Sequence, residues 1–366
     1  MNYLIEQPFS AAAALFVACL SLAGQTSPEQ VQPSSGLVHT GAIAFNSTTR
    51  KVYVVDKIRS EVVIINTVGD TVARVGVGTG PVSIAVNERS GNVYAVSAGT
   101  GTVSVLDGAS DALLATVRVV DRPYSIAVNP ATGKVYVSHT FSNKTSVIDG
   151  ATNAAVPVTT GSIDLIAVDS QADRVYLLSY EGGSLGVLDG ARISLEHLQA
   201  GKHAWGMALN PATHELYVAR VGTGDVIAIG PRADAGAVIP AGQAPVCLAI
   251  NSKTNMIYAG NYSSGDVTVI DGGAHRAVAN VRVGSHPQAI AVDEARNLIF
   301  VANTLSGTIT EIDGATNRAV ATLPAGRSPY ALVVDPGGSK VYVANGSGND
   351  AFTRVDLPGA GAPAGH

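Results

Sequence analysis

The chain repeats one pattern of apolar and polar positions eight times. In each copy an apolar run alternates small and large side chains and closes on Asn or Asp, and successive closing residues are 41, 42, 40, 41, 41, 42 and 42 positions apart. They are Asn46, Asn87, Asn129, Asp169, Asn210, Asn251, Asp293 and Asp335. A regular period just above forty residues with β-type patterning is typical of propeller blades.

The first strand predicted in each copy has no polar face. Two positions before the closing residue stands Ala in seven copies and Val333 in the eighth, and large apolar residues flank it, as Ile126 and Val128 do. Alternation of small and large apolar residues indicates that both faces are buried, as in wedge-shaped sheets packed around an axis.

Turn residues separate this strand from the strands that follow. A run of Asn-Pro-Ala-Thr-Gly occupies residues 129–133, and four other copies have Gly91, Asp173, Asn255 and Asn297 at the last position, residue types that tolerate a left-handed backbone. The second strand has Tyr as its second residue in seven copies and Phe300 in one. The third strand ends in Asp-Gly in five copies, a strong turn signal, and the fourth is less regular.

Counting the strands predicts an all-β propeller of four-stranded blades, with eight blades favoured and seven as the alternative. The first three strands occur eight times, but a fourth follows only the first seven copies, which makes 31 strands in all. An open ring would leave an unpaired edge, so we expect residues 30–38 to supply the fourth strand of the last blade.

Several motifs resemble the YVTN-family β-propeller repeat over residues 38–356. They are Val-Tyr-Val-Ala-Asn at 341–345, Ile-Asp-Gly-Ala-Thr-Asn at 312–317 and the Ile-Ala-Val-Asn opening. The resemblance implies the propeller fold, and the family's relatives include exported surface and periplasmic proteins and, more distantly, lactonase-like enzymes. The family's Asn after the second strand is kept at Asn261, Asn303 and Asn345, and Asp56, Ser97, His139, Ser179 and Arg220 replace it elsewhere. We interpret these Asn residues as turn caps without a catalytic role.

The amino-terminal sequence predicts export. Residues 11–23 are largely apolar, and Ser21 and Ala23 are the small residues that a signal peptidase requires, although Glu6 stands where basic residues are usual. The predicted segments are a signal peptide at 1–23, a linker or closing strand at 24–36, the propeller at 37–358 and a disordered tail at 359–366. A retained anchor is the alternative to cleavage, but thirteen apolar residues are too few for a stable membrane span. The protein is therefore expected in the periplasm, outside the cell or on its surface.

Composition narrows the possible partners. The chain has 366 residues, 46% hydrophobic and 14% charged, which is too apolar for a disordered protein. Its formal net charge of −5 gives no general basic field, so we expect no nucleic-acid partner. Cleavage after Ala23 would leave Cys247 as the only cysteine and allow no intrachain disulfide. We expect a monomer.

Candidate binding residues come from one repeat position. The loops from the fourth strand to the next first strand, and from the second strand to the third, share one face of a propeller, called here the top face. Seven residues before each closing residue stand the ring residues His39, Gly80, Arg122, Ser162, His203, Ala244, His286 and Ser328. Nearby loop positions add Tyr124, Trp205, Tyr330, Arg327, Lys202, His139 and Arg220, and Asp121 and Asp164 are expected to neutralise part of the ring.

Cations mixed with aromatic rings suit an anionic or planar ligand, through charge-assisted hydrogen bonds and stacking. The candidate ligand-binding residues are His39, Arg122, Tyr124, His203, Trp205, His286, Arg327 and Tyr330. The alternative interpretation is that they are ordinary loop residues. A metal site built from His39, His139, His203 and His286 is disfavoured, because ligands from distant blades would have to meet about 2 Å from one ion.

No catalytic motif is present, so the sequence favours a binding or scaffold protein without a cofactor, whose partner is an anionic small ligand or another protein. No Ser-His-Asp spacing, Cys-x-x-Cys pair, phosphate-binding glycine loop or His-Glu-x-x-His motif occurs. Two alternatives remain. One is a lactonase-like hydrolase of the 6-phosphogluconolactonase type, which would need a metal near the axis, and the other is a partner subunit of an extracytoplasmic redox enzyme.

The predicted closing strand can be tested by deletion. Removing residues 30–38 should leave the last blade with an unpaired edge and lower the melting temperature sharply, as measured by circular dichroism. An unchanged melting temperature would show that another segment closes the ring.

Overall fold

The computed structural model describes residues 42–68, 71–189, 192–201, 203–231, 236–335, 340–346 and 351–357, without the side chains of residues 71 and 192–199. The chain divides into two units, residues 1–37 and 38–366, and the described residues all belong to the second. The predicted signal peptide, closing segment and tail lie outside the described residues, as do His39 and Lys202.

The described elements are 31 strands in eight antiparallel sheets, numbered here as blades 1 to 8. Blade 1 consists of β1 (Ile43–Asn46), β2 (Lys51–Asp56), β3 (Glu61–Asn66) and β4 (Thr71–Gly76), and blade 2 of β5 (Pro81–Val86), β6 (Asn92–Ser97), β7 (Thr102–Asp107) and β8 (Leu113–Arg118). Blade 3 consists of β9 (Pro123–Val128), β10 (Lys134–His139), β11 (Lys144–Asp149) and β12 (Ala155–Thr159), and blade 4 of β13 (Leu165–Asp169), β14 (Arg174–Leu178), β15 (Ser184–Asp189) and β16 (Arg192–Gln199). Blade 5 consists of β17 (Ala204–Leu209), β18 (Leu216–Arg220), β19 (Asp225–Ile229) and β20 (Val238–Pro240), and blade 6 of β21 (Pro245–Asn251), β22 (Met256–Asn261), β23 (Asp266–Asp271) and β24 (Arg276–Arg282). Blade 7 consists of β25 (Pro287–Asp293), β26 (Leu298–Asn303), β27 (Thr308–Asp313) and β28 (Arg318–Pro324), and blade 8 of β29 (Pro329–Val334), β30 (Lys340–Asn345) and β31 (Phe352–Asp356).

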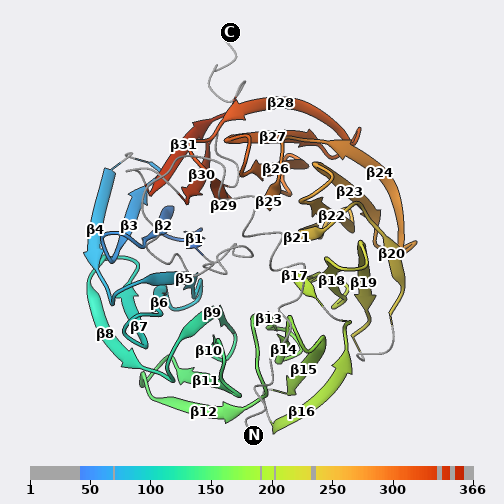
Figure 1. Ribbon diagram of the computed structural model, residues 1–366. Coiled ribbons are helices and arrows are strands. Elements are labelled where there is room, and N and C mark those ends of the chain that lie inside the picture. The colour runs from blue at the N-terminus through green and yellow to red at the C-terminus, as the bar shows by residue number, and fades with distance from the viewer. Residues whose placement is uncertain are drawn as a thin grey trace, which may run out of the picture. The chain divides into compact units, whose positions relative to one another are not determined.

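The predicted all-β propeller with eight blades is confirmed, and the seven-bladed alternative is wrong. Each of the first seven sheets holds four strands in chain order, and the eighth holds three among the described residues, β29, β30 and β31. The first strand of every blade faces the centre of the ring and the fourth runs along its perimeter (Figure 1). The predicted fourth strand of blade 8 falls on residues outside the described part, so it stays a prediction.

Blades 1 and 8 close the ring through side-chain contacts of described residues. Ile43 and Tyr53 of blade 1 share one apolar cluster with Tyr330 and Ala331 of blade 8. An Arg50 guanidinium nitrogen lies 2.6 Å from the Asp335 carboxylate, which is almost fully buried. The first and last copies of the repeat therefore pack together like any other neighbouring pair.

Full burial of the first strand, predicted from its apolar alternation, was wrong. In β9 the residues Ala127 and Val128 are only partly buried, whereas Val135 and Val137 of β10 are fully buried. The first strand is the inner edge of each blade, so its sheet covers it on one side only. The second and third strands carry most of the buried side chains instead.

The closing Asn and Asp residues cap the turn that follows them. In blade 6 the buried Asn251 Oδ1 accepts hydrogen bonds from the backbone N–H groups of Lys253 (3.1 Å) and Thr254 (3.3 Å). The same pair of bonds forms at Asn46, Asn87, Asn129, Asp169 and Asp293. These Asx turns use the side-chain oxygen to replace a backbone acceptor.

The same side chains also bind the next blade, which the sequence pattern did not reveal. The partner is the left-handed residue of the neighbouring turn, with φ between 51° and 59°. These inter-blade bonds are Asn129 Nδ2 to Asp173 Oδ1 (2.8 Å), Asn210 Nδ2 to Asn255 Oδ1 (2.7 Å), Asn251 Nδ2 to Asn297 Oδ1 (2.7 Å), the His214–Asp169 contact (2.7 Å) and the Arg50–Asp335 ion pair.

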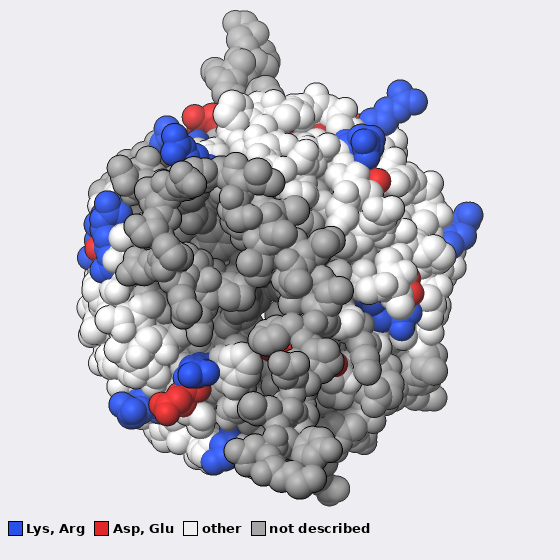
Figure 2. Space-filling model, in the orientation of Figure 1, with Lys and Arg blue, Asp and Glu red and all other residues white. Residues whose placement is uncertain are grey.

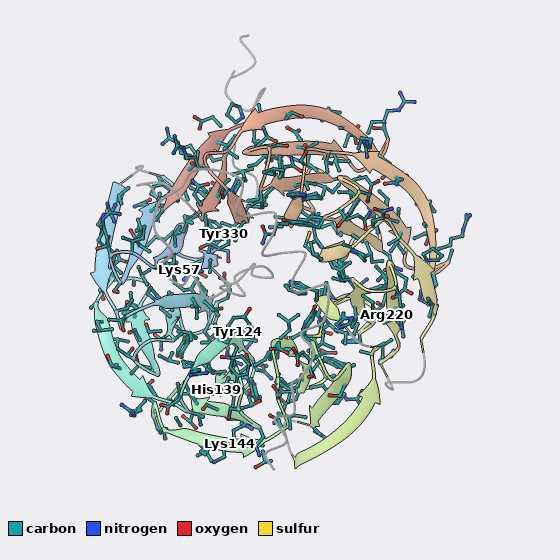
Figure 3. All side chains as sticks on the ribbon, in the orientation of Figure 1. Lys57, Tyr124, His139, Lys144, Arg220 and Tyr330 are labelled. Atoms are coloured by element: carbon teal, nitrogen blue, oxygen red, sulfur yellow. The ribbon has the colours of Figure 1, made fainter. Side chains whose placement is uncertain are left out.

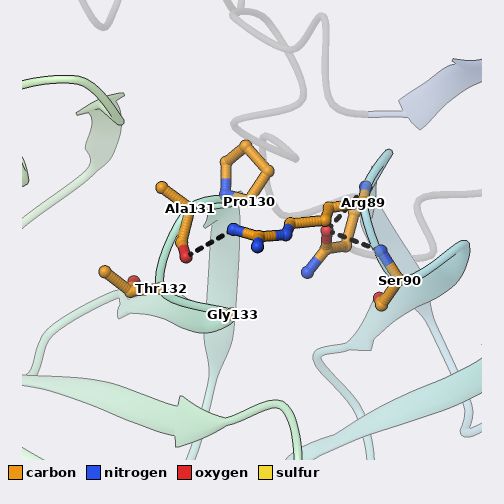
Figure 4. A pocket seen from close by; sticks show the side chains of 7 residues that line it. Arg89, Ser90, Pro130, Ala131, Thr132 and Gly133 are labelled. Atoms are coloured by element: carbon orange, nitrogen blue, oxygen red, sulfur yellow. Dashed lines mark hydrogen bonds between the residues drawn. The ribbon is translucent and has the colours of Figure 1, made fainter.

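A glycine removes this bond between blades 2 and 3. The turn residue there is Gly133, with φ of 74°, which has no side chain to offer to Asn87. A groove of about 280 Å³ lies at this point, lined by residues that include Asn87, Arg89 and Pro130 (Figure 4). An Arg89 guanidinium nitrogen donates a hydrogen bond to the Ala131 carbonyl oxygen (3.2 Å) across it. This groove is on the face opposite the top face.

The inter-blade bond gives a paired stability test. Asn251→Ala removes two capping bonds and leaves the Asn297 amide oxygen without its donor, so we expect a loss of about 2 to 3 kcal/mol in the free energy of unfolding. Asn87→Ala removes the same two capping bonds but no inter-blade bond and should lose about 1 kcal/mol. Urea denaturation measures both, and equal losses would show that the inter-blade bond contributes nothing.

Candidate functional site

The ring position has a left-handed backbone in six blades. Gly80, Arg122, His203, Ala244, His286 and Ser328 have φ between 52° and 61°. The carbonyl oxygen of each accepts a hydrogen bond of 2.8 to 3.0 Å from the backbone N–H of the first residue after its own blade's second strand. These donors are Ala98, Thr140, Val221, Tyr262, Thr304 and Gly346. This hydrogen bond joins the loop before the first strand of a blade to the loop after its second strand. Because it also forms at Ala244 and Ser328, which are not basic, it is a structural feature of the repeat.

Arg122 stands beside an exposed aromatic ring. Its guanidinium carbon lies 5.7 Å from the centre of the Phe141 ring, and Phe141 is 89% exposed. Tyr124, two residues along β9, is partly buried and lies near the centre of the ring in Figure 3. This part of blade 3 therefore presents a cation and two aromatic rings on or near the top face.

His203 and Trp205 meet an aromatic residue of blade 4. The Tyr180 ring lies 4.5 Å from Trp205 in an edge-to-face arrangement, at 81°, and 5.5 Å from His203, tilted by 47°. The backbone N–H of Tyr180 donates a hydrogen bond to Asp164 Oδ2 (2.8 Å). Burial raises the pKa of the Asp164 carboxyl, and the nearby charge of Glu181 raises it further.

His286 lines a groove between blades 6 and 7. Its imidazole stacks on Tyr262 with ring centres 4.2 Å apart and planes inclined by 6°. The groove, of about 190 Å³, is also lined by Ser264, Arg282 and Ser285. Burial lowers the pKa of His286, so a neighbouring anion would be needed to favour its charged form near neutral pH.

Tyr330 contacts a lysine of blade 1. The Lys57 ammonium nitrogen lies 5.3 Å from the centre of the Tyr330 ring, and Tyr330 is buried. Burial raises the pKa of Tyr330 to about 12, so the phenol is neutral at physiological pH. Figure 3 shows both residues on the side of the ring formed by blades 8 and 1. Arg327, which precedes β29, is exposed.

Sequence reasoning missed the aromatic and basic partners of the ring. Among the described ring residues, Arg122, His203 and His286 contact Phe141, Tyr180 and Tyr262 respectively. Lys57, Tyr180 and Tyr262 occupy one repeat position, eleven residues after the closing Asn or Asp, so aligning that position across the copies would have found them.

Two expected members of the top-face group are occupied in structural contacts. His139 is fully buried, with Nε2 2.8 Å from Ser146 Oγ and Nδ1 3.3 Å from the Asp121 carbonyl oxygen. Arg220 makes two bonds to the Asp225 carboxylate, of 2.5 and 2.8 Å. Figure 3 shows both residues farther from the centre than Tyr124. Neither side chain is offered to a ligand.

The Asn residues that the repeat keeps after the second strand bind the third strand. Asn261 Nδ2 donates hydrogen bonds to Asp266 Oδ1 (2.8 Å) and Thr268 Oγ1 (2.9 Å), and Asn303 Nδ2 donates to Thr310 Oγ1 (3.0 Å). The buried His139–Ser146 contact spans the same seven positions. These contacts support the interpretation of this position as structural.

The described residues contain no group of three or more His, Cys, Asp or Glu side chains that is arranged to hold a metal ion. Burial raises the pKa of the Cys247 thiol to about 12. Figure 2 shows Lys and Arg of the described surface as separate groups along the rim, several beside Asp or Glu. None of the described segments is a helix long and apolar enough to cross a membrane.

Many solved structures are similar to this chain, and two of them are described here. Hydrazine synthase of Kuenenia stuttgartiensis is similar with a TM-score of 0.63 and 17% identity, over 79% of this chain and 99% of that chain. Dihydro-heme d1 dehydrogenase NirN in complex with DHE is similar with a TM-score of 0.67 and 17% identity, over 96% of this chain and 84% of that chain. No family model and no curated protein matches the sequence. At this identity the likeness concerns the fold alone.

The buried His139 leads to a prediction of how the stability of the protein depends on pH. Burial lowers its pKa, so the unfolded chain, with an ordinary value near ~6.5, binds this proton more readily, and the free energy of unfolding should fall as the pH decreases through that value. His139→Asn keeps a hydrogen-bonding partner for the Ser146 hydroxyl and removes the titration. We expect similar stability above about pH 7.5 and a smaller decrease towards about pH 5, as measured by urea denaturation. Identical pH profiles would show that His139 does not contribute.

Proposed function

We propose that the protein is an exported binding module without catalytic activity, whose top face takes an anionic or planar ligand or a partner protein. The observation that carries this proposal is the pairing of basic ring residues with aromatic side chains, at Arg122 with Phe141 and at His286 with Tyr262. The propeller fold, which the similar solved structures share, supports a binding or scaffold role in general terms.

The groove of blades 6 and 7 is the best-defined part of this surface. The stacked pair of His286 and Tyr262 offers flat apolar area for a planar ligand, and the hydroxyl of Ser285 offers a hydrogen-bond donor beside it. Arg282 lines the same groove and donates a hydrogen bond of 2.6 Å to the Ser264 carbonyl oxygen, which fixes its guanidinium group there. These groups suit a small ligand that carries an anionic substituent.

The apolar segment at residues 11–23 supports export, because a propeller that works outside the cytoplasm needs a signal of this kind. Measuring the amino terminus of the mature protein by mass spectrometry would test cleavage after Ala23.

Ligand binding can be tested by thermal shift at about pH 8 and pH 6 with phosphate, sulfate, a nucleotide and benzoate. A bound anion favours the imidazolium form, so the stabilisation should grow as the pH falls, most strongly below about 6.5 because burial lowers the pKa of His286. Arg122→Ala should reduce the anion shifts, and His286→Asn should remove those from the groove.

Ser328→Ala is the matched control, because it alters the same repeat position without removing a cation. It should bind as the wild type does. If the variants keep every ligand with the same pH dependence, the ring is not the binding surface.

A further inference from the structure

The top face where blades 4 and 5 meet has an aromatic corner unlike the rest of the ring. Tyr180 and Trp205 stand at 81° with ring centres 4.5 Å apart, and the imidazole of His203 lies 5.5 Å from Tyr180 as a third wall. All three residues are partly buried, so each keeps some exposed surface. Two aromatic faces at right angles, with a third beside them, form the shape in which proteins hold organic cations.

Two acidic side chains, Asp164 and Glu181, lie beside this corner. The Asp164 carboxylate is held against the backbone N–H of Tyr180 through Oδ2, at 2.8 Å, and Glu181 follows Tyr180 in the chain with an exposed side chain. Burial raises the pKa of Tyr180, and the charges of Glu181 and Asp164 add to that effect. The electrostatic character here is therefore opposite to that of Arg122 or of the groove at His286.

The neighbouring cation of blade 5 does not neutralise these acids. Arg220 binds Asp225 through two nitrogens, at 2.5 and 2.8 Å, and both side chains are partly buried. Burial raises the pKa of Asp164 because it removes water from the carboxylate. A cation placed beside the carboxylate would stabilise its charged form and lower that pKa again. A positively charged ligand would thus gain from the carboxylate and from the rings together.

We propose that this corner, made of Asp164, Tyr180, His203 and Trp205, binds the quaternary ammonium group of a small molecule. A quaternary ammonium spreads its charge over methyl groups and needs no hydrogen-bond acceptor, whereas a primary ammonium is compact and strongly hydrated. The inference deepens the proposed function by giving one part of the top face a ligand class of its own, and it rests on that function only in using the same face.

The chain contains one tryptophan, so the fluorescence of Trp205 reports on this corner directly. Choline is the probe, and 3,3-dimethyl-1-butanol is its control, because it has the same shape without the charge. We expect a saturable change of the Trp205 emission with choline and none with the neutral alcohol. No saturable response to choline, or an equal response to both compounds, would overturn the proposal.

Substitutions separate the charge from the rings. Asp164→Asn keeps an acceptor for the Tyr180 N–H but removes the charge, and Tyr180→Leu removes one aromatic wall; each should weaken choline binding about tenfold. Ser328→Ala changes the ring position of blade 8 and lies outside this corner, so it should bind choline as the wild type does. Wild-type affinity in Asp164→Asn and Tyr180→Leu would place the choline elsewhere and overturn the assignment.

The wild-type comparison of choline with its neutral analogue needs no variant, so a variant that fails to fold leaves the test intact. The anion screen of the proposed function is separate from it. If phosphate or benzoate binds and choline does not, the top face is a binding surface without this corner. If choline alone binds, the corner stands and the anionic ligand of the proposed function is wrong.

Discussion

The ring is held together by the closing Asn or Asp of a blade, which in blades 3 to 6 makes two kinds of contact at once. The oxygen of the closing Asn or Asp replaces a backbone acceptor in its own turn, while the amide nitrogen or second oxygen binds the turn of the next blade. Because these side chains are buried, leaving either partner unsatisfied would be costly. The spacing of the repeat and the packing of the ring are therefore set by the same residues, and the Arg50–Asp335 pair extends the arrangement across the junction of the first and last copies.

Sequence reasoning predicted the blade count because strand order within each blade is local. Asp-Gly turns, the recurrent Tyr of the second strand and the forty-residue period all act between neighbours in the chain. It could not predict contacts across blades, such as Asn129 with Asp173, because they join residues more than forty positions apart through side-chain direction. The burial of the first strand was misjudged for a related reason, since an apolar pattern does not distinguish an inner edge from a covered strand.

In the candidate site too, the sequence indicated the repeat positions but not the side-chain contacts between them. The ring position was visible in the sequence, but the structure shows that Arg122, His203 and His286 each meet an aromatic residue from a second loop, as His286 meets Tyr262. His139 and Arg220 were misplaced because the sequence gives the position of a residue in the repeat and not the partner that its side chain finds, here Ser146 and Asp225. Charge is likewise divided between blades, with Asp164 and Glu181 on one part of the face and Arg122 and Arg282 on others.

The left-handed backbone of the ring position has a consequence for how such a face evolves. Its conformation is maintained by a backbone hydrogen bond from the adjoining loop, with Arg, His, Ala, Ser or Gly at the position. A residue other than glycine there gives up about 1 kcal/mol relative to glycine, which is small against the packing of a whole blade. Substitution at any of these six positions can therefore change the chemistry of one blade without disturbing its neighbours, so the repeat can carry different binding groups on a constant backbone.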